Sequence, residues 1–424
     1  NIAIIGLGNI GGYLFKYLKK NKVILSKKNN CIPNVVYISA KNKKRKRGFK
    51  INKKIWLNNY LNATKNKNVD LIVELIGGAE GPAKKLVFSA LKNKKHVVTA
   101  NKALIAKYGD QLSKIAEKNR VNLEFEASVC GGVPIIRSLK ESLIANKISK
   151  VFGIFNGTSN YILSSMDKEN KSFKEVLQNA KELGFAESNP TSDLDGEDVA
   201  SKLKILSSLC FSSFLNKNVH VEGIKDIDKD DINYAKRLGY KIKLLGYAER
   251  IGKNIFQRVH PTLIRNNSYV ASINGVLNAV IIDGNPVGQS IIQGEGAGPA
   301  ATTSALISDI SSILRGNIKF PFSISNKERK NLNFKQISER LFSAYFRFNV
   351  IDKPGVLSNI TQVFSRNRVS IKRLVQDPNK NKSSSSIIII THPSKDKSLN
   401  KIIQTINKRS YVKKRSKLIR IDNE

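Results

Sequence analysis

The sequence predicts an α/β fold in which a doubly wound parallel sheet is followed by an α+β domain and a C-terminal βαββαβ module. Three patterns support this expectation. The apolar run 1–5 leads directly into the glycine turn GLGNIG. Apolar runs then alternate with amphipathic segments as far as residue 127, which is typical of parallel strands joined by helices. After residue 340, strand-like and helix-like patterns follow one another in βαββαβ order.

Length and composition indicate a globular protein of two or three domains. The chain has 424 residues, of which 41% are hydrophobic and 25% are charged. It contains neither a signal-peptide pattern nor an apolar run long enough for a membrane span, so we expect a cytoplasmic protein with no membrane partner. Cys31, Cys130 and Cys210 lack metal-ligand spacing and are expected to be reduced. Because Met166 is the only methionine, we expect the natural N-terminus to lie before Asn1.

The net charge of +40 at first suggests nucleic-acid binding, because basic surfaces attract phosphate backbones. The lysines are, however, spread over the whole chain among abundant Asn and Ile, and they do not gather on one element with interleaved aromatic residues. We attribute the charge to a general compositional bias. We therefore expect no specific nucleic-acid partner, only weak nonspecific binding at low salt.

The glycine turn after the first strand is the pattern of a Rossmann-type dinucleotide site. It stands between an apolar strand and an amphipathic helix, which is the context that the GxGxxG motif requires. The phosphates would lie at the helix N-terminus, where free amides and the helix dipole favour anions. A glycine turn without a ligand is the alternative. The residues expected to bind the cofactor here are Gly6, Gly8, Asn9, Ile10 and Gly11.

The loop after the second strand, 35–39, favours NADP over NAD. An NAD site would place an acid at the end of this strand, but the first acid of the chain is Asp70. Lysines and arginines crowd residues 41–47 instead and suit a 2′-phosphate. The alternatives are NAD as cofactor and a loop filled by the general lysine bias.

Further strands are expected at 70–75, 96–99 and 121–127, with helices at 82–92 and 108–119. In a doubly wound sheet, ligands meet the carboxyl ends of the strands. Three residues at these ends are therefore added to the cofactor site: Gly77, Thr99 and Lys102.

The stretch 181–202 concentrates acidic residues in a chain that has only 33 of them. Asp195 is expected to cap a helix, on which Asp198 and Lys202 share a face. We expect Lys202 to be half buried, with a pKa lowered toward neutrality, and to carry a proton. A solvated ion pair is the alternative. The surrounding acids suit a cationic ligand such as an amino-acid ammonium.

Several motifs occur in one order along the chain: GLGNIG, VVTANKAL, FEASVCGGVPII, NGTSNYIL, GFAESNPTSDLDGEDVASKL and GEGAGPAATTSALISDI. Together they resemble the homoserine dehydrogenase family over residues 1–320. The resemblance implies the reversible NAD(P)-dependent oxidation of L-homoserine to L-aspartate 4-semialdehyde, in threonine, methionine and isoleucine biosynthesis. Another Rossmann-type amino-acid dehydrogenase remains an alternative, and it would give Glu187 and Lys202 no special role.

The resemblance also assigns roles to single residues. A neutral Lys202 would take the hydroxyl proton, and the nearby ammonium of Lys102 would help lower its pKa. Asp198 belongs to the same catalytic group, and Gly298 lies in a segment that closes over the cofactor. The residues expected to bind substrate are Glu187, Asp193, Asp198, Gly157 and Thr158. A monovalent cation, sodium, would be bound by main-chain oxygens of Glu126, Val129, Gly131 and Val133.

The C-terminal region resembles an ACT domain. Its DKPGVL turn and the VSIKRLVQ run fit such a module, which implies an amino-acid effector, threonine, and assembly into a homodimer or homotetramer. A module that only holds subunits together, and a degenerate sensor without activity, are the alternatives. The expected divisions are a dinucleotide-binding domain at 1–130, a substrate, catalytic and dimerisation domain at 131–318, a polar linker at 319–340 and the ACT domain at 341–424. A fused aspartate kinase is not expected.

Overall fold

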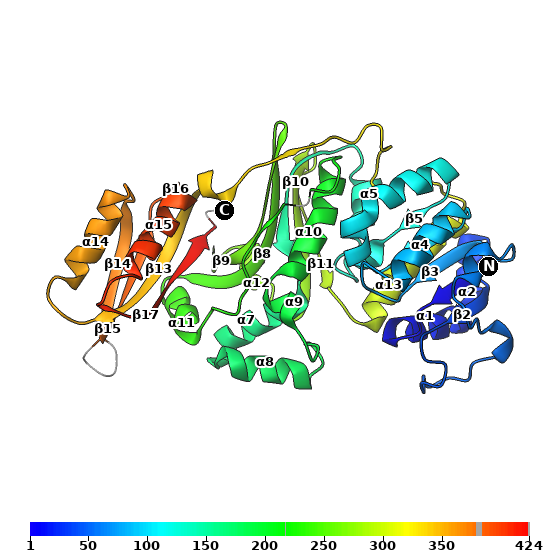
Figure 1. Cartoon of the computed structure of the whole chain (residues 1–424), viewed down its shortest axis with the longest axis horizontal. Helices are drawn as coiled ribbons and strands as arrows, with labels where there is room; N and C mark the ends of the chain where they lie inside the picture. Colours follow the sequence, from blue (N-terminus) through cyan, green and yellow to red (C-terminus); the bar gives the residue numbers. More distant parts are fainter. Residues whose placement is uncertain (217, 379–383, 423–424) are drawn as a thin grey trace.

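The computed structural model describes residues 1–216, 218–378 and 384–422. Figure 1 shows an elongated molecule with the N-terminal sheet at one end, a helix-covered sheet in the middle and the C-terminal module at the other end. Across the described part of the chain, we find no helix with the length and apolar surface that a membrane span requires.

The N-terminal sheet is parallel, in the order β2-β1-β3-β4-β5. Side chains alternate along β1: Ala3 and Ile5 pack on the face that carries α4 and α5, whereas Ile2 and Ile4 pack on the opposite face with α1. Helices on both faces confirm the predicted doubly wound fold. The strands are β1 (Ile2–Ile5), β2 (Val35–Ser39), β3 (Leu71–Glu74), β4 (His96–Thr99) and β5 (Leu123–Glu124).

The helices of this region are α1 (Asn9–Lys20), α2 (Lys22–Asn29), α3 (Asn62–Lys65), α4 (Pro82–Lys92) and α5 (Lys102–Asn119). We expected α5 to begin at residue 108, but it begins at Lys102. The cause is Asn101, whose side chain accepts a hydrogen bond from the backbone N–H of Leu104 and so caps the helix earlier. The early start places Lys102 at the first turn of the helix.

The middle region is an antiparallel sheet in the order β11-β10-β6-β8-β9. Helices α7, α10 and α11 lie against it. Its strands are β6 (Lys147–Ile154), β7 (His220–Val221), β8 (Tyr240–Ile251), β9 (Asn254–Arg265), β10 (Leu277–Asn285) and β11 (Gly288–Glu295). Its helices are α6 (Ile135–Arg137), α7 (Gly157–Glu169), α8 (Phe173–Glu182), α9 (Thr191–Leu194), α10 (Glu197–Cys210), α11 (Lys229–Arg237) and α12 (Tyr269–Ser272).

The cap of α10 differs from the prediction. Gly196, with φ 85°, occupies the N-cap position and no side chain caps the helix. Asp195 forms an ion pair with Lys225 at 2.6 Å instead. Glycine is suited to this position because its φ lies in the left-handed region. Most residues of α10 are buried, because the helix is enclosed between the sheet and α5.

Helix α13 (Pro299–Leu314) returns from the middle region to the N-terminal sheet. Leu306 and Ile310 of α13 complete the apolar cluster under Ile2 and Ile4. Residues 319–340 then cross the molecule, with β12 (Asn333–Phe334) on the way. We expected a polar linker, but Phe322 is fully buried against Phe125, and Arg329 donates a hydrogen bond to Asp110 at 2.6 Å. This segment therefore fastens the first two regions together.

The C-terminal module has the predicted βαββαβ order, with sheet order β17-β13-β15-β14. Strand β17 also pairs in parallel with β9, through Arg420 opposite Thr262, so the module continues the middle sheet. The predicted module at 341–424 includes residues 379–383 and 423–424, which lie outside the described residues. Its elements are β13 (Leu341–Ile351), α14 (Val356–Arg366), β14 (Ile371–Pro378), β15 (Ser384–Thr391), β16 (Ser394–Lys395), α15 (Asp396–Ile406) and β17 (Val412–Ile421).

Candidate functional site

The glycine turn between β1 and α1 has the geometry of a phosphate cradle. Gly6 has φ 108°, and a Cβ there would lie 2.3 Å from the carbonyl oxygen of Leu75. A Cβ on Gly11 would lie 1.9 Å from the carbonyl oxygen of Gly6, so strand and helix pack too closely for any side chain. A Cβ on Gly8 would meet nothing within 4 Å, which leaves the backbone open to a ligand.

A hollow of about 760 Å³ opens beside this turn. Its lining includes Gly6 and Gly8 together with Lys41 and Arg45 of the basic loop. Arg47 also lines it, but its guanidinium donates hydrogen bonds to main-chain oxygens, including that of Leu7 at 3.1 Å. Burial and the neighbouring Arg45 lower the pKa of Arg47. Lys41 and Arg45 are therefore the groups best placed for a phosphate.

The other predicted cofactor residues lie apart from this hollow. Asn9 lines a smaller hollow of about 330 Å³ with Gly8 and Pro299. Thr99 is fully buried, and its hydroxyl donates to the Glu74 carboxylate at 2.5 Å. Glu74 in turn accepts the backbone N–H of Gly77 at 3.0 Å, so these residues shape the strand ends from within. Neither hollow is lined by Ile10, Gly11, Gly77, Thr99, Lys102 or Gly298.

Lys202, Asp198 and Lys102 form one ionic cluster around the buried carboxylate of Asp198. Lys202 Nζ lies 2.8 Å from one carboxylate oxygen of Asp198, and Lys102 Nζ contacts the other oxygen. Lys202 is 8% exposed and Asp198 2%, whereas the Lys102 side chain is 41% exposed. Lys102 comes from α5 at the end of β4, and the other two come from α10. The cluster therefore joins the dinucleotide-binding region to the middle region.

Lys202 is more buried than predicted, and its pKa shifts in the opposite direction. Burial alone would lower the pKa of Lys202, but the charge of Asp198 outweighs burial and raises it above its usual value. Burial would raise the pKa of Asp198, yet Lys202 and Lys102 hold it well below its ordinary range. The prediction of a pKa lowered toward neutrality was therefore wrong, because the carboxylate of Asp198 lies 2.8 Å from the Lys202 ammonium and outweighs burial.

Asn156 completes this cluster and was missed by the sequence argument. Its side-chain amide donates to Asp193 Oδ1 and to Asp198 Oδ2, both at 2.8 Å. Lys202 Nζ donates to the carbonyl oxygen of Phe155, the preceding residue, at 2.6 Å. The motif NGTSNYIL did contain a signal, because an asparagine between a strand and a polar helix start is a typical N-cap.

The predicted substrate residues gather around the start of α7. Gly157 is the first residue of α7, and a Cβ there would lie 2.7 Å from the carbonyl oxygen of Val276. Thr158 donates its hydroxyl to the carbonyl oxygen of Phe185 at 2.8 Å, which fastens the loop before α9 to this helix. Burial and the charge of Asp198 raise the pKa of Asp193. Glu187 lies exposed on the same loop.

The predicted cation loop is a tight turn between β5 and α6. Cys130 has φ 52°, and its carbonyl oxygen accepts the N–H of Val133 at 2.6 Å. Gly132 donates to the carbonyl oxygen of Glu295 at 2.8 Å. Within the described ranges, His, Cys, Asp and Glu side chains nowhere form a group of three suited to a metal ion. A cation here would depend on main-chain oxygens, which are hard donors that suit sodium.

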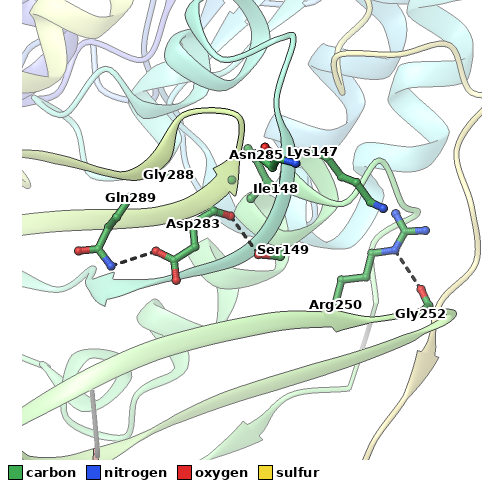
Figure 2. A pocket seen from close by; sticks show the side chains of 10 residues that line it. Lys147, Ile148, Ser149, Arg250, Gly252, Asp283, Asn285, Gly288 and Gln289 are labelled. Atoms are coloured by element: carbon green, nitrogen blue, oxygen red, sulfur yellow. Dashed lines mark hydrogen bonds between the residues drawn. The ribbon is translucent and has the colours of Figure 1, made fainter.

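A further hollow, of about 750 Å³, lies away from this cluster at the ends of β6, β8 and β10 (Figure 2). Its polar groups are largely paired with one another: Arg250 donates to the carbonyl oxygen of Gly252, Gln289 donates to Asp283, and Asp283 also pairs with Lys150. No residue of the predicted site lines it. We do not include it in the functional site.

The chain is similar to characterised families over nearly its whole length. Family models match the homoserine dehydrogenase NAD-binding domain at residues 6–126, homoserine dehydrogenase at 134–311 and the AHAS small subunit-like ACT domain at 346–414. Homoserine dehydrogenase of Neisseria gonorrhoeae is 36% identical, covering 100% of this chain and 98% of the relative.

Solved structures agree with this similarity. A homoserine dehydrogenase from Thiobacillus denitrificans has a TM-score of 0.91 at 35% identity, covering 99% of this chain and 97% of that one. A hyperthermophilic archaeal homoserine dehydrogenase in complex with NADPH has a TM-score of 0.63 at 25% identity, covering 74% of this chain and 96% of that one. The chain belongs to the homoserine dehydrogenase family of NAD(P)-dependent oxidoreductases and carries a C-terminal ACT domain.

Proposed function

We propose that the enzyme reduces L-aspartate 4-semialdehyde with NADPH and that Lys202 carries the proton. The observation that supports this role is the shared carboxylate: Asp198 binds Lys202 from α10 and Lys102 from the dinucleotide-binding region. A proton carrier must lie where substrate and cofactor meet. This cluster lies at the junction of the two regions, with α5 and α10 in contact.

The charged state of Lys202 favours proton donation. NADPH, when bound, supplies the hydride to the carbonyl carbon. Lys202 in its ammonium form donates a proton to the carbonyl oxygen as negative charge develops there, and Asp198 holds the lysine in place. In the oxidation direction Lys202 must first lose its proton and then accept the hydroxyl proton of L-homoserine. Lys102, which contacts the other carboxylate oxygen of Asp198, would bring a second positive charge near the substrate carbonyl oxygen.

The acids of the α9 loop suit the substrate ammonium. Asp193 lies within the cluster through Asn156, and Glu187 lies on the adjoining loop. Together they would bind the substrate ammonium, while Gly157 and Thr158 shape the floor of the site at the start of α7. A carboxylate opposite a partly desolvated ammonium contributes both orientation and affinity.

NADP preference is supported by the chemistry of the hollow beside the glycine turn. Lys41 and Arg45 line it, and the chain has no acid before Asp70. The archaeal relative with bound NADPH is consistent with this preference. The cofactor preference can be tested by following NADPH absorbance with aspartate semialdehyde as substrate and then repeating the assay with NADH. We expect a clear preference for NADPH that Arg45→Ala reduces, and equal rates with both cofactors would contradict the proposal.

Sodium binding through Glu126, Val129, Gly131 and Val133 is part of the proposal. It is supported by a turn built from backbone contacts, in which a Cβ on Gly131 would lie 3.0 Å from the carbonyl oxygen of Gly296. We expect lower activity when sodium is replaced by a large organic cation at constant ionic strength. Unchanged activity would remove the ion from the proposal.

We propose threonine as the effector and a homodimer or homotetramer as the assembly, in a cytoplasmic enzyme of threonine, methionine and isoleucine biosynthesis. A path of contacts supports regulation: Arg420 of β17 binds Glu222 at 2.9 Å, and Gly223 packs against Leu194 and Asp195, next to Asp193.

Assembly is supported by β11, which lies at the edge of the middle sheet, where its free side is available to pair with a second copy. Free cysteines are consistent with a reducing compartment.

Lys202→Ala tests the central role. We expect turnover to fall by about 10²–10⁴-fold, the usual contribution of a positioned acid or base, with NADPH binding nearly intact. Lys204→Ala is the matched control, because Lys204 lies two residues along the same helix and is only partly buried. Turnover and NADPH binding by fluorescence titration are the measurements. Full activity of Lys202→Ala would remove this residue from the mechanism.

A further inference from the structure

Asn156 uses every hydrogen-bonding group of its side chain. The amide oxygen accepts the backbone N–H of Ser159 at 2.8 Å and so caps α7. The amide nitrogen donates to Asp193 and to Asp198, each at 2.8 Å. The residue is 5% exposed. One neutral group is thus wedged between two carboxylates and the start of a helix.

The cap by itself does not require asparagine. Serine, threonine and aspartate cap helices as well as asparagine does, because each supplies an acceptor oxygen. Among these residues only asparagine also supplies two N–H donors from one nitrogen. Asp198 is buried and Asp193 is half-buried, each 2.8 Å from that nitrogen, and two carboxylates so close together repel each other unless donors lie between them.

We propose that Asn156 is a positioning residue for the reaction: its amide orients Asp198 toward Lys202 and Lys102 and holds Asp193 as a charged group for the substrate ammonium. This inference rests on the proposed roles of Lys202 and Asp193. The charged groups that face Asp193 are Asp198 and Lys202 from α10 and Lys102 from α5. Burial and Asp198 favour the neutral form of Asp193, whereas the Asn156 hydrogen bond and the two lysines favour the charged form.

Asn156→Ser separates the two tasks, because serine keeps the cap of α7 but lacks the paired donors. We expect kcat/KM for aspartate semialdehyde to fall about 10–100-fold, as for the loss of a hydrogen bond to a charged group, mainly through KM. The acid limb of the kcat/KM profile should move to higher pH, because Asp193 then takes up a proton more readily. NADPH binding should be unchanged.

Asn160→Ser is the matched structural control. Asn160 is a buried amide on the same helix; its nitrogen donates to the carbonyl oxygens of Ile273 and Leu277, and its oxygen accepts a hydrogen bond from Lys243 at 3.0 Å. The Asn160→Ser variant should have a lower melting temperature, but the acid limb of its kcat/KM profile should not move. The proposal would be overturned if folded Asn156→Ser kept both the wild-type KM and the wild-type acid limb of the kcat/KM profile. It would also be overturned if Asn160→Ser moved the acid limb by the same amount as Asn156→Ser.

Asn156→Asp keeps the test decisive if the serine variant does not fold, because aspartate matches the size of asparagine and retains the capping oxygen. It supplies at most one donor and adds a third carboxyl group beside Asp193 and Asp198, so KM should rise at least as much as in the serine variant, and a wild-type KM would overturn the proposal. Lys202→Ala distinguishes failure of the proposed function from failure of the positioning role of Asn156. If that variant stays active, the proposed function fails; if it is inactive while Asn156→Asp and Asn156→Ser behave as wild type, only this inference fails.

Discussion

The pKa of Lys202 is raised, although burial by itself would lower it. An isolated ammonium at 8% exposure would lose its proton readily, but Asp198 at 2.8 Å and the carbonyl oxygen of Phe155 at 2.6 Å stabilise it. The usual argument that burial alone prepares a lysine as a base therefore does not hold here. The same contacts keep Lys202 in the protonated form that the proposed carbonyl reduction requires, although a raised pKa also makes the ammonium a weaker acid.

The direction of this pKa shift predicts opposite pH dependences for the two directions of the reaction. Because the pKa of Lys202 is raised, the ammonium persists through the neutral range, so reduction should lose this acid only at strongly alkaline pH. Oxidation needs the neutral amine and should rise with pH. In Asp198→Asn the opposing burial dominates, and the alkaline limb of reduction should move to lower pH. Profiles of kcat/KM check this, and an unmoved limb would argue against Lys202 as the acid.

Glu187 is predicted to act on substrate affinity. It lies exposed on the loop before α9, where a free carboxylate can meet the substrate ammonium. Glu187→Gln should raise KM for homoserine about 10-fold or more, because a charge-assisted contact is replaced by a neutral one. Glu182→Gln, an acid at the end of α8 that binds Gln178, should leave KM unchanged. Wild-type kinetics in Glu187→Gln would place the ammonium elsewhere.

At the scale of elements, the C-terminal module is joined to the middle region by buried ion pairs. Arg347 of β13 donates to Asp231 of α11 at 2.7 Å, and their side chains are 3% and 0% exposed. Arg347 also contacts Asp228, which is partly exposed. Burial raises the pKa of Asp231 despite Arg347, whereas Arg347 lowers the pKa of the more exposed Asp228. Arg347 thus has one deep partner, Asp231, and two shallower ones, because Asp230 also lies 3.6 Å from its guanidinium.

Asp231→Asn should strongly destabilise this junction. Removing one member of a buried pair costs about 3–5 kcal/mol, because the remaining charge loses its compensation. Asp230→Asn is the control for an exposed partner of the same arginine: the Asp230 side chain is 62% exposed and lies 3.6 Å from Arg347, so its loss should change stability by no more than about 0.5 kcal/mol. Urea denaturation of both variants measures the difference. Equal stabilities would show that Arg347 finds sufficient compensation from Asp228.

At the scale of the whole molecule, the module is continuous with the sheet beside the site. Strand β17 pairs with β9, and Arg420 at 1% exposure binds Asp396 of α15 and Glu222 of the middle region. Truncation after Arg340 would uncover β9 and its apolar surface, so loss of threonine inhibition in a truncated chain would not by itself identify the effector module. A single substitution in the full chain is the cleaner experiment.

Glu222→Gln should weaken inhibition by threonine while leaving basal activity near wild type. Glu222 binds Arg420 of the module, and the adjoining Gly223 packs on Leu194 and Asp195. A neutral side chain at position 222 weakens the ion pair with Arg420 but does not contact the cluster around Lys202. Glu339→Gln, an exposed acid paired with Lys395 and Lys397, is the control. Dose–response curves with threonine test this, and unchanged inhibition would exclude this path.

Much of the fold could be predicted because it depends on local patterns. The limits of β2, α4 and β4 agree with the apolar runs and the proline that mark them, and a local capping box between Ser172 and Glu175 starts α8. The start of α5 and the cap of α10 were wrong, because each depended on which neighbouring side chain reached the helix end. The packed segment at 319–340 was missed because its few apolar residues are separated by polar ones.

The sequence by itself determined the order of strands and helices, the glycine cradle and the concentration of acids near Lys202, since these follow from residue type and spacing. Only the tertiary structure decided that Asn156 lies between Asp193 and Asp198, that Lys102 and Lys202 share one carboxylate, and that the pKa of Lys202 is raised. The reason is that a pKa and a hydrogen bond depend on distances between residues far apart in the chain, which no local pattern contains.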